Sequence, residues 1–443
     1  MRKILCFLTF AACFAVAVGA PLSLKQALDE GLKGNLDIQS SELGFQGMDA
    51  QIDEAFRRYL PQITANGRVT HLFLNDPIRI PDLPGPIAAM MGIPITEVSL
   101  NWAVTGDITL NQFLYVPQAL TGIKMAKKGK EISALGRQEL KEGIVYGITI
   151  QYWTTVYMEE NLDVLEKSKA NLSRTREVIA AMVEQGIVKK SDLNTIDINL
   201  ASLNTQIDNL KVQIQTQKDA LLQVMGRTPG EQIALTDRLD PDSRLSEEIS
   251  GDPLQSSITL RRMEQQIKLQ DMRIDLTRQE IYPNVVAFAS YGTKSGGEKI
   301  SDIKDNFKDD GGVVGINVTV PLFDGMSNKA KRSNARIQKK QLEIDMEKQR
   351  LALQATYETA KSTLFNAKNL VLRNKENVKL AEENYVMKEL EYQEQVAPVT
   401  DLLTADNSMQ TARSNLISAL YSEKTAELAL EQVLGILRQR AGD

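Results

Sequence analysis

The chain reads Asp192-Leu193-Asn194-Thr195-Ile196-Asp197 and, 209 residues later, Asp401-Leu402-Leu403-Thr404-Ala405-Asp406. The same spacing, without a gap, relates Gln223-Val224-Met225-Gly226 to Gln432-Val433-Leu434-Gly435. A duplication this regular predicts an architecture of two equivalent halves. Each half is expected to run helix, strand, strand, very long helix, tip and long helix.

Two very long helices are predicted over residues 117–185 and 327–395, because neither range contains an internal proline. About seventy residues at 1.5 Å rise per residue make roughly 100 Å of helix, several times the usual helix length. Returning helices are expected to begin at Ser191 and Thr400, which are both good N-cap residues. Each half therefore ends in a long antiparallel helical hairpin. Shorter helices, over residues 24–57 and from 254 to 281, are expected to open the two halves.

Four further segments alternate apolar and polar residues, which is typical of strands with one apolar and one polar face. They lie at residues 63–70, 98–111, 284–292 and 314–320, and a loop rich in glycine, lysine and aspartate is expected between the last two. One such strand fits an ordinary sandwich, but four of them, separated by long helices in a secreted chain, favour a membrane barrel. The expected lipid-facing positions are Leu100, Trp102, Val104, Ile316 and Val318.

Four strands cannot close a membrane barrel alone, because open sheet edges cannot face lipid and single-chain barrels begin at about eight strands. Closure therefore requires association of several chains. Two copies would give eight strands and three would give twelve, and strand patterning by itself does not choose between them.

Composition limits both the compartment and the chemistry. Residues 1–20 have the features of a secretory signal peptide, with cleavage expected after Gly19 or Ala20. Cys6 and Cys13 both lie in this segment, so the mature chain has no cysteine for a disulfide, unless Cys13 is retained as a lipidation site. The formal net charge of −5 gives no electrostatic footprint for nucleic acid.

The sequence shows no catalytic constellation, cofactor-binding motif or metal-ligand set. His71 is the only histidine, and no cysteine accompanies it in a metal-ligand pattern. We expect it to be a solvated residue of the loop between the first two strands. Because nucleophile elbows and phosphate loops are also missing, the sequence predicts neither an enzyme nor a cofactor-binding protein.

Several short motifs follow one another along the chain in a characteristic order. They are Leu24-x-x-Ala27-Leu28, Leu60-Pro61-Gln62-Ile63, Tyr282-Pro283-Asn284-Val285, Pro321-Leu322-Phe323-Asp324-Gly325, the two Asp-Leu repeats, and Gly226 and Gly435. Together they resemble the TolC-like outer-membrane efflux protein family (outer membrane factors). The resemblance implies a mainly α fold with membrane β structure. Long antiparallel hairpins would form a periplasmic α-barrel, and four strands per chain would contribute to a trimeric twelve-stranded outer-membrane β-barrel.

The same resemblance implies a passive exit duct of a tripartite efflux or type I secretion system. Its implied partners are two further copies of the chain, a periplasmic adaptor, an inner-membrane pump and outer-membrane lipid. Its implied location is the bacterial outer membrane, with a long periplasmic extension. Two other classes stay open: a periplasmic coiled-coil scaffold or adaptor without a membrane barrel, and a diffusion porin, which would need many more strands per chain.

The family's periplasmic entrance is narrowed by aspartates near the start of the last long helix. By position these correspond to Asp401 and Thr404, so this chain keeps the first aspartate and has threonine at the second. The alternative is that Asp401, like Asp192 in the other repeat, is simply an acidic first-turn residue favoured by the helix dipole.

The family's adaptor-contacting tips have a glycine turn, which here corresponds to Gly186, Ile187 and Val188 in the first half and to Gln395, Val396 and Ala397 in the second. The second tip lacks the glycine and contains Pro398. A family glycine pair after the last strand likewise becomes Gly325-Met326.

The expected division of the chain follows the duplication. It comprises a signal peptide (1–20), a first repeat (21–230), a connector (231–253), a second repeat (254–437) and a C-terminal tail (438–443).

Overall fold

The computed structural model describes residues 20–71, 73, 102–240, 251–297, 299–303 and 309–437. The predicted signal peptide up to residue 19, both cysteines, Leu100 and the tail at 438–443 lie outside these ranges. The described chain is mostly helical with a small sheet, as the sequence predicts.

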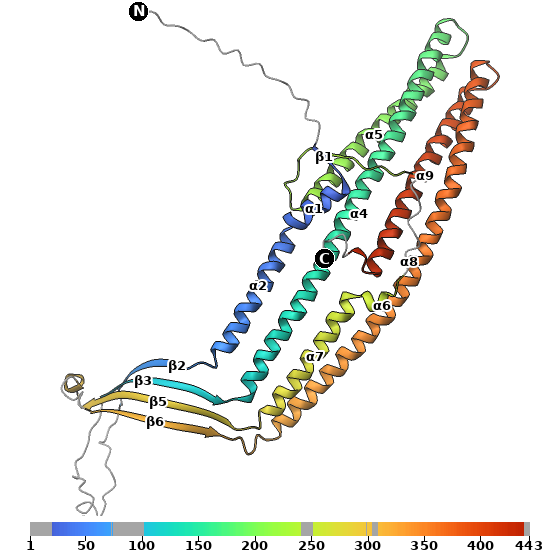
Figure 1. The fold of residues 1–443 in the computed structure, drawn as a ribbon. Helices are drawn as coiled ribbons and strands as arrows, with labels where there is room; N and C mark the ends of the chain where they lie inside the picture. Colours follow the sequence, from blue (N-terminus) through green and yellow to red (C-terminus); the bar gives the residue numbers. More distant parts are fainter. Residues whose placement is uncertain are drawn as a thin grey trace, which may run out of the picture. The chain divides into compact units, whose positions relative to one another are not determined.

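The two halves repeat one order of elements (Figure 1). The first half contains α1 (Leu24–Gly34), α2 (Leu36–Arg57), β2 (Gln62–His71), β3 (Trp102–Tyr115), α4 (Pro117–Glu184) and α5 (Lys190–Met225). The second half contains α6 (Pro253–Ser256), α7 (Ile258–Gln279), β5 (Asn284–Gly297), β6 (Asp309–Thr319), α8 (Ser327–Gln393) and α9 (Val399–Val433). Three short elements, β1 (Ala20–Leu22), β4 (Ile233–Leu235) and the 3-10 helix η1 (Ile300–Ile303), complete the described chain. We call α4 with α5 the first hairpin and α8 with α9 the second hairpin.

The first helix is divided where a single one is expected over residues 24–57. Asn35 ends α1, and its side-chain oxygen accepts hydrogen bonds from the backbone N–H groups of Asp37 and Ile38 at 2.9 and 3.0 Å. Its amide also donates to the carbonyl of Val224 at 2.8 Å, which ties the break to the end of α5. The asparagine therefore caps the start of α2 and connects it to the first hairpin.

The returning helices begin one residue earlier than predicted, at Lys190 and Val399. The residues that precede them, Lys189 and Pro398, have extended backbones with ψ of 147° and 157° and occupy the cap positions. Ser191 consequently lies inside the first turn and is not an N-cap. Neither cap residue makes a side-chain hydrogen bond to the helix that follows it.

The first hairpin ends at a glycine that its surroundings require. Gly226 has a left-handed φ of 77°, and its N–H closes the helix on the carbonyl of Gln223. A Cβ at this position would lie 2.2 Å from the carbonyl oxygen of Gly34. Both the conformation and the close approach of α1 exclude a larger residue.

The four longer strands form one antiparallel sheet in the order β2-β3-β5-β6. The last two strands are longer than predicted, because Thr293 pairs with Asp310 and Lys294 with Asp309, which extends both strands into the expected loop. Glycine in this stretch disguises the alternation on which strand prediction depends. Strands β2 and β6 lie at the two edges of the sheet.

The chain forms two compact units, and each combines segments of both halves. One unit contains the sheet and spans residues 45–132 and 264–344. The other contains both hairpin ends and the core, and its described part lies within residues 20–44, 133–263 and 345–437. Among the described residues, no helix is long and apolar enough to cross a membrane.

The core of the second unit is organised around Tyr152. This fully buried side chain of α4 donates its hydroxyl hydrogen to the Asp237 carboxylate at 2.6 Å, and its oxygen lies 2.9 Å from the carbonyl of Leu22. Strand β1 pairs with β4 in parallel beside it. This small two-stranded sheet, absent from the sequence prediction, joins the start of the described chain to the segment after the first hairpin.

Candidate functional site

One face of the four-stranded sheet is apolar and exposed. The strand register aligns Ile63, Leu110 and Val314 on this face, and Val314 is 83 % exposed. The described positions predicted to face lipid, Trp102, Val104, Ile316 and Val318, share this face by the same register. An exposed apolar surface of this kind is typical of a site that contacts a membrane or another protein.

The opposite face is mixed, because Val286, Phe288 and Val313 share it with polar residues that form hydrogen bonds across the strands. Asn66 donates to Asp107 at 3.0 Å, Thr109 donates to the same carboxylate at 2.8 Å, and the hydroxyls of Thr109 and Ser290 are 3.1 Å apart. These side chains connect β2, β3 and β5. The sheet therefore separates a surface suited to lipid from one suited to water.

His71 differs from its prediction as a solvated loop residue. It is the last residue of β2, is half-buried, and its ring centroid lies 4.2 Å from that of Trp102 in an edge-on arrangement. Cross-strand pairing with the tryptophan draws the imidazole into the sheet. No group of residues able to hold a metal ion occurs in the part of the chain that the structure describes.

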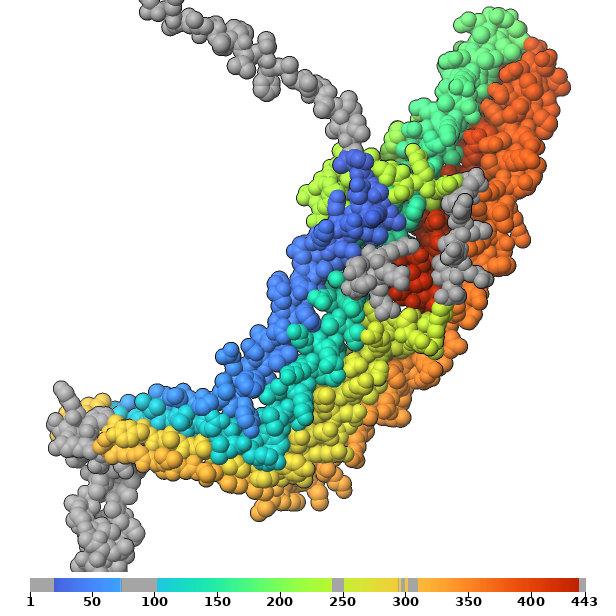
Figure 2. All heavy atoms as spheres, in the orientation of Figure 1, coloured from blue at the N-terminus to red at the C-terminus, as the bar shows by residue number. Residues whose placement is uncertain are grey.

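Helix α8 exposes an apolar stripe at heptad spacing, which we call the α8 stripe. It consists of Ile337, Ile344, Leu351, Phe365, Leu372 and Val386, each exposed, and it is interrupted at the heptad positions of Glu358 and Lys379. In Figure 2, α8 is the orange band, and part of its surface is visible in this view. Shorter exposed rows at multiples of seven lie on α2, at Leu36 and Leu43, and on α5, at Ile198 and Val212. Apolar rows repeating every seven residues are the surfaces through which long helices pack side by side.

The two hairpin tips have the same backbone geometry although their sequences differ. Gly186 and Gln395 both adopt left-handed φ angles, of 71° and 63°. In each tip this residue's N–H bonds three residues back, and the next N–H, of Ile187 or Val396, bonds five residues back. Ile187 is 46 % exposed and Val396 is 77 % exposed, whereas Val188 and Ala397 are half-buried.

The predicted entrance residues lie on the exposed side of α9. Asp401 and Thr404 are both exposed and are three residues apart, so they share one helix face. Thr404 lines a groove of about 450 Å³ between α8 and α9 whose polar walls are uncharged. The other polar lining residues are Asn374, Asn377, Asn407, Ser408, Thr411 and Asn415. The electrostatic effect of Asp401 reaches Lys388, whose pKa is raised first by its hydrogen bond to Glu391 and in smaller part by Asp401.

The equivalent acid of the first hairpin has the same backbone position. The N–H of Asp192 bonds to the carbonyl of Lys189, and that of Asp401 bonds to Pro398, both at 3.0 Å. Asp192 is half-buried and accepts a hydrogen bond from Ser191 at 3.3 Å. The two acids therefore differ in exposure and side-chain bonding, although both belong to a first helical turn.

Comparison with known proteins agrees with this geometry. Residues 250–436 match the family model described as outer membrane efflux protein. The fold resembles the outer membrane protein VceC of Vibrio cholerae at 14 % identity, with TM-score 0.72 over 93 % of this chain and 96 % of that one. It also resembles the CmeC outer membrane channel of Campylobacter jejuni at 15 % identity, with TM-score 0.76 over 93 % of this chain and 85 % of that one. A third similar structure is the MtrE outer membrane channel of Neisseria gonorrhoeae, at 17 % identity, with TM-score 0.72 over 93 % of this chain and 88 % of that one. No curated protein sequence is significantly similar to the chain.

The resemblance to the TolC-like outer-membrane efflux proteins is confirmed. The family match covers the second half of the chain, and the structural likeness covers both halves. At these identities the structural likeness establishes a shared fold. Of these structurally similar proteins, CmeC and MtrE are outer membrane channels.

Sequence reasoning missed one charged residue inside the hairpin core. Asp406 of α9 is only 1 % exposed. It lies between Leu402 and Met409 at spacings of four and three, on the buried face of the helix. That spacing in the sequence is the signal that would have identified it.

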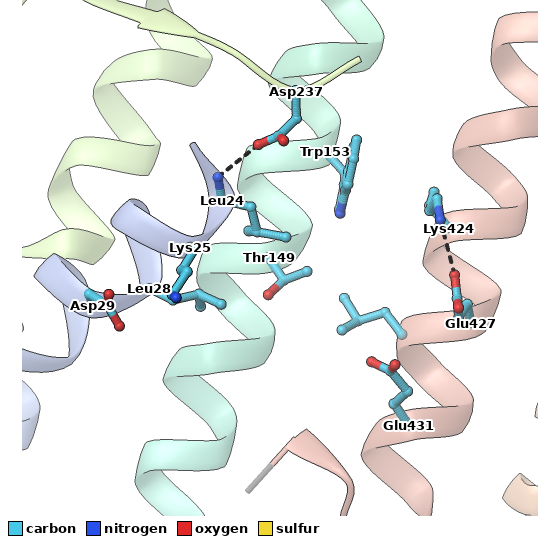
Figure 3. A pocket seen from close by; sticks show the side chains of 11 residues that line it. Leu24, Lys25, Leu28, Asp29, Thr149, Trp153, Asp237, Lys424, Glu427 and Glu431 are labelled. Atoms are coloured by element: carbon cyan, nitrogen blue, oxygen red, sulfur yellow. Dashed lines mark hydrogen bonds and ion pairs between the residues drawn. The ribbon is translucent and has the colours of Figure 1, made fainter. Parts of the chain in front are cut away.

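A cavity of about 600 Å³ is lined by residues of α1, α4 and α9 (Figure 3). Trp153 and Lys424 face each other across it, with the ammonium 6.0 Å from the ring centroid. Lys424 also bonds to Glu427 at 3.3 Å, and Asp237 accepts the N–H of Leu24 at 2.8 Å. Three of the charged residues that line the cavity, Asp237, Lys424 and Glu427, are thus engaged with neighbouring residues, which suits a structural joint between the helices.

Proposed function

We propose that the protein is the outer-membrane exit channel of a tripartite efflux or type I secretion system. In this role it is a passive conduit, and an inner-membrane pump supplies the energy through a periplasmic adaptor. The sheet is the observation that carries the proposal, because its apolar face is exposed while its polar face forms cross-strand hydrogen bonds. Lipid would cover the apolar face, and the polar face would line a water-filled barrel.

Closure of the barrel requires copies of the chain, because β2 and β6 are edge strands and membrane strands need closed pairing. In a homotrimer, β6 of one copy pairs with β2 of the next and gives a twelve-stranded barrel. The α8 stripe then packs against the exposed apolar rows of α2 and α5 on the neighbouring copy. This head-to-tail contact repeats around a closed ring.

The experiment for this assembly combines mass measurement with conductance. The protein extracted from outer membranes in mild detergent is expected to have the mass of three chains and to form ion-conducting pores in a planar bilayer. A monomer found in the soluble periplasm would support the coiled-coil scaffold instead.

Neighbouring residues of β6 test the assignment of the faces. Val318→Arg places a charge on the apolar face and is expected to cost roughly 2–4 kcal/mol near the bilayer midplane, which reduces the amount of trimer in the outer membrane. Asn317→Arg, one residue away on the opposite face, is expected to assemble normally. Equal loss of trimer in both variants would contradict the assignment.

We further propose that Asp401 and Thr404 surround the periplasmic entrance and that the two tips contact the adaptor. Three Asp401 carboxylates around one axis would favour cations. Asp401→Asn is therefore expected to lower the cation selectivity of single channels in a bilayer, whereas Asp192→Asn is expected to leave it unchanged. Unaltered selectivity in Asp401→Asn would leave that residue the role of a first-turn helix acid.

A further inference from the structure

Asp406 is a buried acid at the contact between the two hairpins. The apolar cluster around it contains buried residues of α4, α5, α8 and α9. The carboxylate oxygen Oδ2 accepts a hydrogen bond from the Ser168 hydroxyl of α4 at 2.7 Å. The other oxygen, Oδ1, is buried and has no hydrogen-bond partner among the described residues. A carboxylate removed from water with a single hydrogen bond is poorly compensated.

The charged and titratable groups around Asp406 do not fully offset the unfavourable burial of its carboxylate. Burial raises the pKa of Asp406 above its ordinary value, and the Ser168 hydrogen bond and the Arg413 charge only partly oppose this. Arg413 is itself bonded to Glu382 of α8 at 2.7 Å. From α8, Tyr385 also faces this region.

The tyrosine responds to the same environment. Burial, followed by the charges of Glu389 and Asp406, raises the pKa of Tyr385 to about 12, against smaller opposing effects of Thr175 and Arg174. Its hydroxyl is therefore neutral at physiological pH. Because a tyrosine is never positively charged, Tyr385 cannot offset the charge of Asp406 in either state.

The duplicated plan shows what is different about this site. With the spacing of 209 residues, Asp406 corresponds to Asp197, and Tyr385 corresponds to Arg176. In the first hairpin Arg176 and Asp197 form an ion pair at 2.5 Å between partly exposed side chains. In the second hairpin a tyrosine replaces the arginine, and the acid is buried against the other hairpin.

We propose that Asp406 and Ser168 form a proton-sensitive contact between the two hairpins, in which protonation of Asp406 strengthens the packing of α9 on α4 and ionisation weakens it. The serine suits both states, because a hydroxyl can donate to a carboxylate and can accept from a carboxylic acid. The inference concerns the pairing of the hairpins and does not depend on what the channel conducts.

The sign of the effect follows from proton linkage. An acid whose pKa is higher in the packed state binds its proton more tightly there than in the separated state. The packing is therefore strongest below the ordinary pKa of an aspartate, and it weakens as pH rises through the raised pKa of Asp406. Acid conditions hold the hairpins together, and neutral conditions ease their separation.

Hydrogen exchange tests this directly in the full-length protein in detergent. Deuterium uptake of peptides from α9 residues 399–412 is compared between wild type and Asp406→Asn, from about pH 4 to about pH 8. At the upper end, Asp406→Asn is expected to exchange severalfold more slowly than wild type, because it carries no buried charge. At the lower end the two proteins are expected to converge.

Asp197→Asn is the matched control, because it removes the equivalent acid of the first hairpin. The ratio of its exchange rate to that of wild type, measured in the same peptides, is expected to show no such pH dependence. A ratio for Asp406→Asn that stays constant with pH, or an equal trend in Asp197→Asn, would overturn the proposal.

A second variant keeps the proposal testable if Asp406→Asn misfolds. Ser168→Ala removes the hydrogen bond that favours the ionised form, so the midpoint of the pH-dependent change in exchange is expected to move to higher pH. An unmoved midpoint would contradict the role of Ser168.

Discussion

The two hairpins share one backbone plan and differ in how side chains stabilise it. At the tips, Gly186 adopts its left-handed conformation without steric cost, whereas Gln395 holds nearly the same φ with a side chain present. The next helix starts after Lys189 in one hairpin and after Pro398 in the other, with similar dihedral angles. Backbone geometry is thus retained across the duplication while the residues that produce it have changed.

The cap proline helps to explain how the second tip tolerates Gln395. Pro398 fixes φ near the required value and reduces the freedom of the unfolded chain, which favours the folded turn. The first tip has the flexible Lys189 there and relies on its glycine. In each tip, therefore, only one of the two residues favours the turn. Gly186 does so in the first tip, where Lys189 is neutral, and Pro398 does so in the second, where Gln395 is unfavourable.

Equivalent leucines give the largest expected contrast between the hairpins. Leu402 is 2 % exposed in α9, whereas its counterpart Leu193 in α5 is partly buried. Leu402→Ala is expected to lower the free energy of opening of α9 by about 2–5 kcal/mol, and Leu193→Ala is expected to cost clearly less in α5. Native-state hydrogen exchange of the two helices measures both, and equal costs would mean that the hairpins are equally well packed.

The tips give a smaller contrast with opposite signs. Gly186→Ala is expected to destabilise the first tip by about 1–2 kcal/mol, because alanine is disfavoured at left-handed φ. Gln395→Gly is expected to stabilise the second tip by roughly 1 kcal/mol, since it relieves the same strain. Local exchange of the tip amides reports each change. Destabilisation by Gln395→Gly would show that the glutamine side chain makes a compensating contact.

The smallest expected effect belongs to the exposed ion pair of the first hairpin. Arg176→Ala removes the partner of Asp197, but both side chains are partly solvated and their attraction is screened by salt. Exchange from the first hairpin is therefore expected to rise slightly at low salt and to match wild type at high salt. A large effect that persists in high salt would mean that this pair stabilises the hairpin as strongly as packing does.

Much of the fold is predictable from the sequence, because long proline-free runs and strict alternation are local signals. The strand positions Ile316 and Val318 and the tips at Gly186 and Gln395 all lie where these signals place them. The rest depends on partners distant in sequence. Asn35 divides a helix by bonding to Val224, and Asp406 is buried beside Ser168.

Two further departures have a similar origin. His71 leaves the predicted loop because it pairs with Trp102, and the glycine-rich ends of β5 and β6 become strand through cross-strand pairing. The departures from the family glycines at Gln395 and Met326 are visible in the sequence. Only the structure shows that these two are the non-glycine residues with left-handed φ among those described.

The pairing of β1 with β4 also has a consequence for the order of folding. Residues 20–22 meet residues 233–235, and Tyr152 joins both ends through Leu22 and Asp237. These contacts lie within the first 237 residues, so the base of the first hairpin can close while the second half is still being made or exported. We expect the second half to pack against it afterwards, because the same core also contains Ala419 and Leu428 of α9. The duplicated halves are therefore alike in plan, and we expect the first half to fold before the second.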